Sequence, residues 1–347
     1  HDLVLFLSPK PSLEDHTIDH SDLHKECENR FGKAYEFVER SNVNPRTGRY
    51  HGFIESYAPT VVTYRKDIWE AVGTAPNTWD DIRKAGRAAK LLHEMPVGIS
   101  LAPEHNANHS LRALMAAFGA SVQNEDGRPV LASANTLEAL KFGKALYEET
   151  MLPETLAWGS PSNNQSVLAG AVSLTIDTMS IIRAAEAKRL PVEPNLALAT
   201  LPEGPRDSGG PAYATNTYVI WRFAKNIDGA QKFLLDYMGA FRDGLLKSGF
   251  QNMPSFPGTV ADLNDLIRAS SQKGSRYNVL MEVPESLTNL GYPGYSNAAT
   301  DEVLNRHIIP EMFSRVASGA ASPQESMDLA SAAIVPIFDK WREAGKI

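Results

Sequence analysis

Cysteine is almost missing from this sequence, since Cys27 is the only one among 347 residues. A single cysteine cannot form an internal disulfide, so disulfide use says nothing about the redox compartment of the protein. In the segment KECENRF the neighbours of Cys27 carry both signs of charge, and no histidine is adjacent to it. These neighbours therefore give little support for a reactive thiol at this position.

Long apolar runs and basic clusters are lacking as well. No segment approaches the roughly 20 consecutive apolar residues that a membrane-spanning helix requires. The net charge of −7 is spread along the chain, and no group of Lys and Arg is interleaved with aromatic residues. This pattern argues against nucleic acid as a partner.

The common catalytic motifs are also absent. The chain contains no G-x-S-x-G nucleophile elbow, no P-loop, no H-E-x-x-H pair and no dinucleotide fingerprint followed by an acidic residue. Carboxylate pairs are frequent, as in any acidic protein, and only geometry can assign one of them to glycoside hydrolysis. No motif supports catalysis, and we expect neither a cofactor nor a metal.

The features that are present indicate an ordinary globular chain with two lobes. A length of 347 residues is more than twice the commonest domain size, so two separate cores are expected. Short β-type runs alternate with helical patterns, which is the α/β signature. Pro59 to Tyr64 precedes a helix over Asp67 to Val72, and Ser173 to Ile176 precedes a helix over Met179 to Ala187.

The chain opens on the apolar run Leu3 to Leu7, which predicts a buried strand. Because no signal peptide precedes this run, we expect the natural protein to begin further upstream. Proline and glycine gather in three loops, two of which are candidates for crossings between lobes: Leu201 to Pro211, Met253 to Gly258 and Gly291 to Gly294.

Helix starts are well marked by capping residues. Thr78 with Asp81 and Asn135 with Glu138 each have the spacing of a capping box. Ser322 is followed by a proline at the first helical position and a glutamate at the third. Trp79 lies in the first turn of a helix, where we interpret it as a packing anchor of the core rather than as part of a site.

Seven segments in order carry a family resemblance, although no single one is diagnostic. They are TYRKDIWEAVGTAPNTWDDIRKAGRAAKLL (63–92), PVGISL (96–101), RALMAAFGASVQNEDGRPVLASANTLEALKF (112–142), NNQSVLAGAVSLTID (163–177), LPEGP (201–205), AKNIDGAQKFLLDYM (224–238) and SGAASPQESMDLASAAI (318–334). Together they resemble the extracellular solute-binding proteins of ABC importers, in family 1 and its sugar-binding branch. The resemblance runs over nearly the whole chain.

The resemblance implies an α/β fold of the periplasmic-binding-protein type II, with two lobes, each a sheet flanked by helices. Three crossings would join the lobes, with the ligand cleft between them. The first lobe would comprise residues 1–57 and 216–287, and the second residues 59–215 and 292–347. Family members begin with a further strand, helix and strand, so the first strand-helix unit is expected to be missing here. Any binding residue in that unit would then lie outside this sequence.

A sugar-like ligand requires flat apolar faces for its C–H surfaces and oriented polar groups for its hydroxyls. Trp158, in the loop LAWGSPSNN, is a candidate either for stacking on ligand or for filling core. Tyr292 and Tyr295 flank a Gly-Pro-rich crossing where the family places cleft aromatics. Tyr213 follows Gly210, whose bare backbone allows close approach to a ligand, although a hinge turn explains the pair equally well.

Polar candidates lie near the expected crossings. The triplet Glu55, Ser56 and Tyr57 precedes the strand that leads into YRKD, where the resemblance places ligand contacts. Asp177 ends a predicted strand, a position that favours either ligand binding or capping of the next helix. The ligand-binding set is completed by these residues: Asn164 and Asn297, with Ser8, Lys10, His105 and Asn108 as weaker candidates.

Two histidine groups have spacings that could suit a metal. His105 and His109 flank asparagines, which are poor transition-metal ligands, so a loop and N-cap role is the favoured interpretation. His16, His20 and His24 recur every four residues and would share one face of a helix. For these three we favour a solvated face over a metal site.

The primary prediction is a non-catalytic, monomeric receptor that captures a carbohydrate, either a mono- or oligosaccharide or a sugar alcohol. It would deliver this solute to an ABC permease with its ATPase, from the periplasm or the extracellular space, either free or lipid-anchored at a cysteine upstream of His1. The alternative within binding is a cationic solute such as a polyamine, held by Glu55 and Asp177 within an aromatic cage. An alternative of another class is a hydrolytic enzyme on the same two-lobed scaffold.

Overall fold

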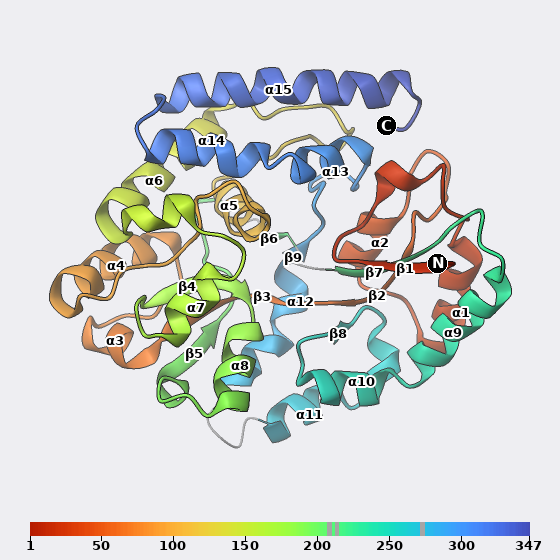
Figure 1. Cartoon of the computed structure of the whole chain (residues 1–347), viewed down its shortest axis with the longest axis horizontal. Helices are drawn as coiled ribbons and strands as arrows, with labels where there is room; N and C mark the ends of the chain where they lie inside the picture. The colour runs from red at the N-terminus through yellow and green to blue at the C-terminus, as the bar shows by residue number, and fades with distance from the viewer. Residues whose placement is uncertain (207–209, 212–214, 271–274) are drawn as a thin grey trace.

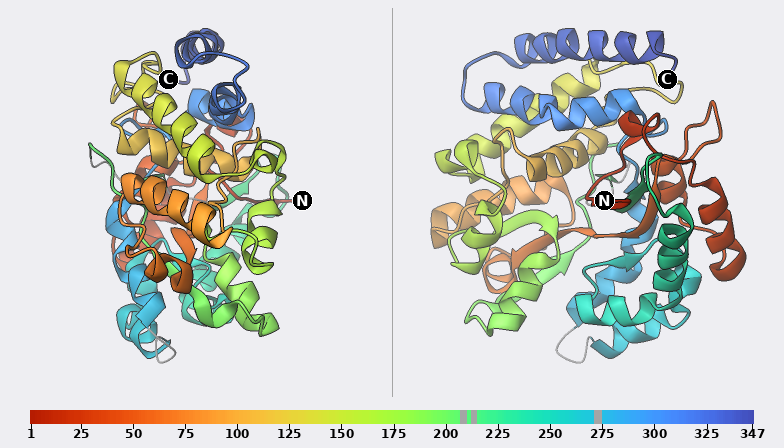
Figure 2. Two further views of the ribbon diagram at one scale, coloured as in Figure 1. Left: turned by 90° about the vertical axis from the view of Figure 1, so that its left-hand side faces the viewer. Right: turned by 45° about the vertical axis from the view of Figure 1, so that its right-hand side comes forward.

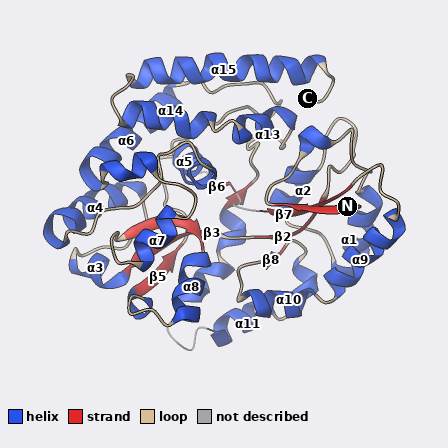
Figure 3. Ribbon diagram, in the orientation of Figure 1, coloured by secondary structure: helices blue, strands red, loops and turns tan. Residues whose placement is uncertain are grey.

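Two separate β-sheets organise the protein, and helices surround each of them (Figure 3). The computed structural model describes residues 1–206, 210–211, 215–270 and 275–347. The first sheet has the order β1-β7-β2-β8, and its strands are β1 (Leu3–Phe6), β7 (Thr215–Ile220), β2 (Phe53–Tyr57) and β8 (Met253–Pro254). The second has the order β4-β3-β5, and its strands are β4 (Leu174–Thr178), β3 (Thr60–Arg65) and β5 (Leu196–Ala199). This is the expected α/β fold.

The chain passes between the two sheets more than once. Only Ala58 and Pro59 separate β2 from β3, which belong to different sheets. The chain returns through the short strand β6 (Gly210–Pro211) before β7. The parallel pair of β6 with β9 (Leu287–Thr288) lies between the two groups of strands (Figure 1). Ala58-Pro59 and β6 thus both contain proline or glycine, and the three expected crossings remain a prediction.

Helices from both halves of the chain cover the sheets. Around the first sheet lie α1 (Ser21–Phe31), α2 (Glu36–Asn42), α9 (Ile227–Gly239), α10 (Phe241–Ser248) and α11 (Leu263–Ser270). Around the second lie α3 (Lys66–Ala71), α4 (Trp79–His93), α5 (His105–Ala117), α6 (Ala134–Thr150), α7 (Ser162–Leu168) and α8 (Ser180–Lys188).

The C-terminal helices gather at one end of the molecule in every view (Figures 1 and 2). After the short α12 (Val283–Ser286) come α13 (Ala298–Asn305), α14 (Ile308–Ala317) and α15 (Pro323–Glu343). The short 3-10 helices are η1 (Pro11–Leu13), η2 (Pro153–Ala157), η3 (Glu193–Asn195), η4 (Pro257–Val260) and η6 (Ser275–Met281). Helix α13 contacts η1, so the C-terminal group touches both halves.

Two apolar clusters form the core. One joins the second sheet to α4, α5, α6, α14 and α15, and contains Trp69, Trp79 and Phe338. Burial of a side chain of this size contributes about 1.5–3 kcal/mol to folding. The other cluster, built around Phe53 and Phe256, extends from the first sheet to α8 and β5. The prediction of Trp79 as a core anchor is confirmed.

The capping predictions have mixed outcomes. The capping boxes at Thr78 and Ser322 are both present, with reciprocal hydrogen bonds between cap and third residue. The predicted box at Asn135 is wrong, because Ser133 is the N-cap of α6 and its hydroxyl accepts a hydrogen bond from the Thr136 N–H. Two capping residues stand close together there, and the chain uses the earlier one.

The opening strand is less buried than its sequence predicts. Strand β1 forms an edge of the first sheet and pairs with β7. Leu5 is 44 % exposed and Leu7, just beyond the strand, is 57 % exposed. An apolar run gives no information about which strand of a sheet lies at its edge.

Candidate functional site

A cavity of about 290 Å³ lies between the two sheets and is lined by residues from both sides. Most of its lining residues have polar side chains, and half of them are amides. The first side supplies Leu7, Ala58, Asn216, Gln251 and Asn252, and the second supplies Asn106, Asn164, Asp177, Thr178 and Ser180. Segments more than 200 residues apart in the sequence therefore form one site.

Asp177 is the only charged residue among the described residues that line this cavity. It lies at the end of β4, where an open α/β sheet commonly holds ligands. Its carboxylate accepts hydrogen bonds from Asn163 Nδ2 at 2.5 Å and from the Thr178 N–H at 2.6 Å. Burial raises the pKa of Asp177 to about 6, although these two bonds favour the ionised form. It does not cap α8, whose N-cap is Met179.

Amide side chains provide most of the remaining hydrogen-bonding capacity. Asn216 Nδ2 donates to Ser56 Oγ at 2.8 Å, and Asn164 Nδ2 donates to Ser180 Oγ at 3.1 Å. The side-chain oxygens of Asn164 and Gln251 are buried and have no hydrogen-bond partner within the described residues. Buried polar atoms are normally satisfied, so these two oxygens are suited to accept hydrogen bonds from a ligand.

The predicted triplet on β2 lies behind the cavity wall. Ser56 contacts the wall through Asn216, whereas Tyr57 is fully buried against Tyr35 and Phe37. Glu55 is buried at an irregularity in the pairing of β2 with β7, and its Oε2 atom has no hydrogen-bond partner within the described residues. Burial raises the pKa of Glu55 to about 7.

The loop that contains Trp158 lies beside the cavity. Asn106 Nδ2 donates to the carbonyl of Ser160 at 2.8 Å. The half-buried Trp158 ring packs so closely over Gly98 that an added Cβ there would lie 2.8 Å from it. Trp158 is not among the lining residues, so its stacking role remains a prediction.

The remaining aromatic candidates lie away from the cavity. Tyr292 is 40 % exposed and lines a separate hollow with Glu203 and Glu282. Tyr295 stacks beneath the guanidinium of Arg40, 5.0 Å from its ring centre. Tyr213 lies outside the described residues, and Gly210 is buried in β6 against Leu201.

Asn297 and the weaker candidates hold structural contacts. Asn297 caps α13, and its Nδ2 donates to Gln123 Oε1 at 2.6 Å. Lys10 Nζ lies 3.0 Å from Asp301 Oδ1, which joins the first half of the molecule to α13. Asn108 Nδ2 lies 2.8 Å from His307 Nδ1.

Ser8 is buried two residues after the end of β1 and follows the cavity residue Leu7. His105 and His109 face each other at 5.1 Å within the first turns of α5 rather than before that helix, because Glu104 is its N-cap. Burial lowers the pKa of His105. All four weaker candidates remain predictions.

The expectation of a solvated face for the early histidines is wrong for two of them. His20 and His24 are buried, whereas His16 is exposed. The three do not share a helical face, because α1 begins at Ser21. His20 Nε2 accepts a hydrogen bond from the Ile220 N–H, and burial lowers the pKa of His20 to about 4.

Sequence reasoning missed most of the amides that line the cavity. Asn106, Asn216, Gln251 and Asn252 were not among the predicted ligand contacts. The one signal that could have selected Gln251 and Asn252 is their place directly before the loop MPSFPG. Within the described residues, no helix combines the length and the apolarity needed to cross a bilayer.

Comparison with known proteins identifies relatives of this architecture. The family model described as "Bacterial extracellular solute-binding protein" matches residues 39–239. Binding proteins of Brucella abortus (strain 2308) and Brucella suis biovar 1 (strain 1330) are 23 % identical over 197 residues, 55 % of this chain and 47 % of theirs. The chain thus spans about half the length of these curated relatives.

Solved structures match over nearly the whole chain. Maltose-bound T. maritima MalE3 has a TM-score of 0.77 at 14 % sequence identity. The match covers 96 % of this chain and 83 % of the MalE3 chain. A solute-binding protein of Agrobacterium radiobacter K84 in complex with ribitol has a TM-score of 0.76 at 18 % identity, with 97 % and 85 % covered. A sugar transporter of Arthrobacter chlorophenolicus A6 with bound laminaribiose has a TM-score of 0.77 at 14 % identity, with 96 % and 84 % covered.

Proposed function

Because the chain belongs to the bacterial extracellular solute-binding protein family, we propose that it is the receptor of an ABC importer for a carbohydrate. The family match covers residues 39–239, more than half of the chain. The observation that carries the proposal is the cavity between the two sheets, whose wall is rich in amides and contains one carboxyl group. Such a wall suits a ligand with many hydroxyls, because each hydroxyl both donates and accepts hydrogen bonds.

The solved relatives support a sugar or sugar alcohol as the ligand class. Their structures hold maltose, ribitol and laminaribiose, and a further relative from Agrobacterium vitis S4 holds D-mannitol. These ligands share a neutral, polyhydroxylated surface. The amide oxygens of Asn164 and Gln251, which lack partners within the described residues, would accept hydrogen bonds from such hydroxyls.

A cationic solute is the weaker candidate for this cavity. Asp177 is the only charged group on its described wall, and Glu55 lies behind that wall. Burial raises the pKa of Glu55 to about 7, which reduces the charge of this carboxyl group near neutral pH. A neutral ligand, unlike a cationic one, does not need a second carboxylate beside Asp177 to balance its charge.

Ligand capture would close the two halves of the molecule on the solute. A ligand that contacts Asn216 on one side and Asp177 on the other makes its full set of bonds only when both walls are near. It therefore favours the closed arrangement over an open one. A wrong ligand would leave buried amides unpaired, and this penalty would provide specificity.

The other parts of the proposal rest on the family. The receptor would act outside the cytoplasmic membrane and present its solute to a permease and ATPase. Hydrolysis of glycosides needs two carboxyl groups that face each other across the bond to be broken. The described cavity wall offers one, so a binding role is favoured over an enzymatic one.

A thermal-shift screen tests the ligand class. The panel consists of maltose, laminaribiose, ribitol, mannitol and the polyamine putrescine, each at low and high salt. A ligand at one hundred times its dissociation constant adds about 2.7 kcal/mol of stability, which raises Tm clearly. We expect a sugar or sugar alcohol to raise Tm independently of salt.

A rise with putrescine alone, weakened by salt, would replace the carbohydrate with a cationic solute. Release of the chromophore from a nitrophenyl glycoside, abolished in Asp177→Asn, would replace the receptor with an enzyme. The exposed residue Asp328 provides the matched control Asp328→Asn, for which we expect wild-type behaviour in both assays.

A further inference from the structure

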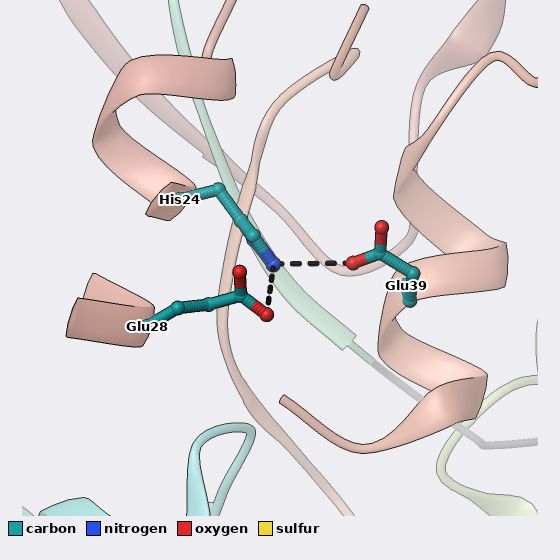
Figure 4. A group of neighbouring side chains, drawn as sticks. All are labelled: His24, Glu28 and Glu39. Carbon is teal, nitrogen blue, oxygen red and sulfur yellow. Dashed lines mark ion pairs between the residues drawn. The ribbon is translucent and has the colours of Figure 1, made fainter. Parts of the chain in front are cut away.

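Three side chains from α1 and α2 converge outside the cavity: His24, Glu28 and Glu39 (Figure 4). His24 Nε2 lies 3.8 Å from Glu28 Oε1 and 3.1 Å from Glu39 Oε2. One nitrogen and two carboxylate oxygens thus lie within 4.8 Å of one another. His24 and Glu28 are four residues apart and share one face of α1, and Glu39 reaches them from α2.

His24 is buried and aimed at the two carboxylates. It is 2 % exposed, and neither ring nitrogen makes a hydrogen bond of normal geometry within the described residues. The ring is fixed by Tyr50, 4.4 Å away between ring centres, and by Phe256 at 5.1 Å. A buried polar group that is held in place but poorly paired is expected to have another partner.

The two carboxylates face both His24 and solvent. The side chains of Glu28 and Glu39 are 35 % and 37 % exposed, which leaves a path for an ion. The Tyr50 hydroxyl donates to the other oxygen of Glu39 and orients it, as outer partners of metal ligands do.

We propose that His24, Glu28 and Glu39 form a binding site for a zinc ion. Tetrahedral zinc with bonds of about 2.0–2.2 Å sets its ligand atoms roughly 3.3–3.6 Å apart. The two distances from His24 Nε2 bracket this range, so small side-chain movements complete three ligands. Water takes the fourth position on the exposed side. The imidazole nitrogen favours zinc over calcium or magnesium, which prefer oxygen ligands.

The site joins α1 to α2. None of its residues lines the solute cavity, so the two sites are separate. An ion that binds the folded chain and not the separated helices stabilises the folded state. The inference is independent of the proposed function, since zinc binding requires neither a sugar nor lobe closure.

The test is a calorimetric titration of chelator-treated full-length protein with zinc chloride. We expect one zinc per chain, and a weakening of at least tenfold in both Glu28→Gln and Glu39→Gln. Glu26→Gln provides the matched control, because Glu26 lies on the same helix but pairs with Arg30 instead. Its zinc affinity should equal that of wild type.

Cobalt provides a second readout that does not depend on stability. Tetrahedral Co²⁺ bound at this site gives intense visible absorption, which we expect to be lost in Glu39→Gln and kept in Glu26→Gln. The proposal is overturned if wild-type protein binds no zinc. It is equally overturned if Glu28→Gln and Glu39→Gln bind zinc as wild type does, because the ion then sits elsewhere.

Discussion

Two buried carboxyl groups, Glu55 and Asp177, lie at or directly behind the cavity wall. In both, burial raises the pKa because the charged form loses the solvation of water. Neither effect can be derived from the sequence, since a carboxyl group on a strand is exposed in many proteins. Burial follows only from how the folded chain packs around each carboxyl group.

The raised pKa of Glu55 predicts how stability changes with pH. The folded state keeps a proton that the unfolded state releases between pH 4.5 and about 7, so stability decreases as the pH rises through this window. Glu55→Gln removes the free-energy cost of ionising this buried carboxyl group in the folded state. We expect it to stabilise the protein by about 1–3 kcal/mol at pH 8 and to have almost no effect at pH 4.

Urea denaturation at several pH values measures this difference. The exposed residue Glu154 gives the control Glu154→Gln, which should leave stability unchanged at each pH. A loss of stability in Glu55→Gln at pH 8 would show that the ionised carboxylate stabilises the folded state, which is the opposite of the predicted cost.

At the same scale, the sequence predicted part of the cavity wall. Asn164 and Asp177 line it, and Ser56 contacts it through Asn216. The other amides were missed because asparagine and glutamine are common in loops, and only the topology of the sheets brings them together. The aromatic residues Tyr292 and Tyr295 lie outside the described cavity, where a Gly-Pro-rich crossing does not reveal which way its side chains face.

Among the elements, helices were easier to predict than the environment of strands. Thr78 and Ser322 each have a capping partner three residues on, and the two residues exchange hydrogen bonds in the structure. Local hydrogen bonds decide such starts, so the sequence contains the necessary information. The exposure of β1 depends on which strand lies beside it, and the apolar run Leu3 to Leu7 does not encode that.

Substitutions at the caps test whether Ser133, as observed, or Asn135, as expected from the sequence, caps the start of α6. Thr78→Ala and Ser133→Ala should each cost about 0.5–2 kcal/mol, because each leaves a backbone N–H of the first turn without its acceptor. Asn135→Ala should cost less than about 0.5 kcal/mol, because its exposed amide only donates to the carbonyl of Gly119. Thermal unfolding of the three variants measures these costs. Equal costs for Asn135→Ala and Ser133→Ala would contradict the start of α6 at Ser133.

For the whole molecule, the chain passes directly from β2 to β3, and Ala58 in this passage lines the cavity that the two sheets share. The sequence predicted the two-lobed fold through ordered segments that resemble a known family, and the fold is confirmed by the relatives of solved structure. Contacts such as Lys10 with Asp301 hold the two halves near each other. These contacts were not predictable, because they join residues almost 300 positions apart.

The central claim is that one solute is held by both halves of the molecule at once. Asn216 lines the first side of the cavity, and Asn164 lines the second side. The matched controls are the exposed residues Asn264, from the first half of the molecule, and Asn77, from the second half; neither lines the cavity. Loss of one hydrogen bond of about 0.5–1.5 kcal/mol weakens binding by roughly two- to twelvefold.

The most direct measurement is calorimetric titration of the best sugar from the screen into wild type and the four alanine variants. We expect weaker binding for both Asn216→Ala and Asn164→Ala and unchanged binding for Asn264→Ala and Asn77→Ala. Unchanged affinity in Asn216→Ala or in Asn164→Ala would place the solute outside the shared cavity and contradict the claim.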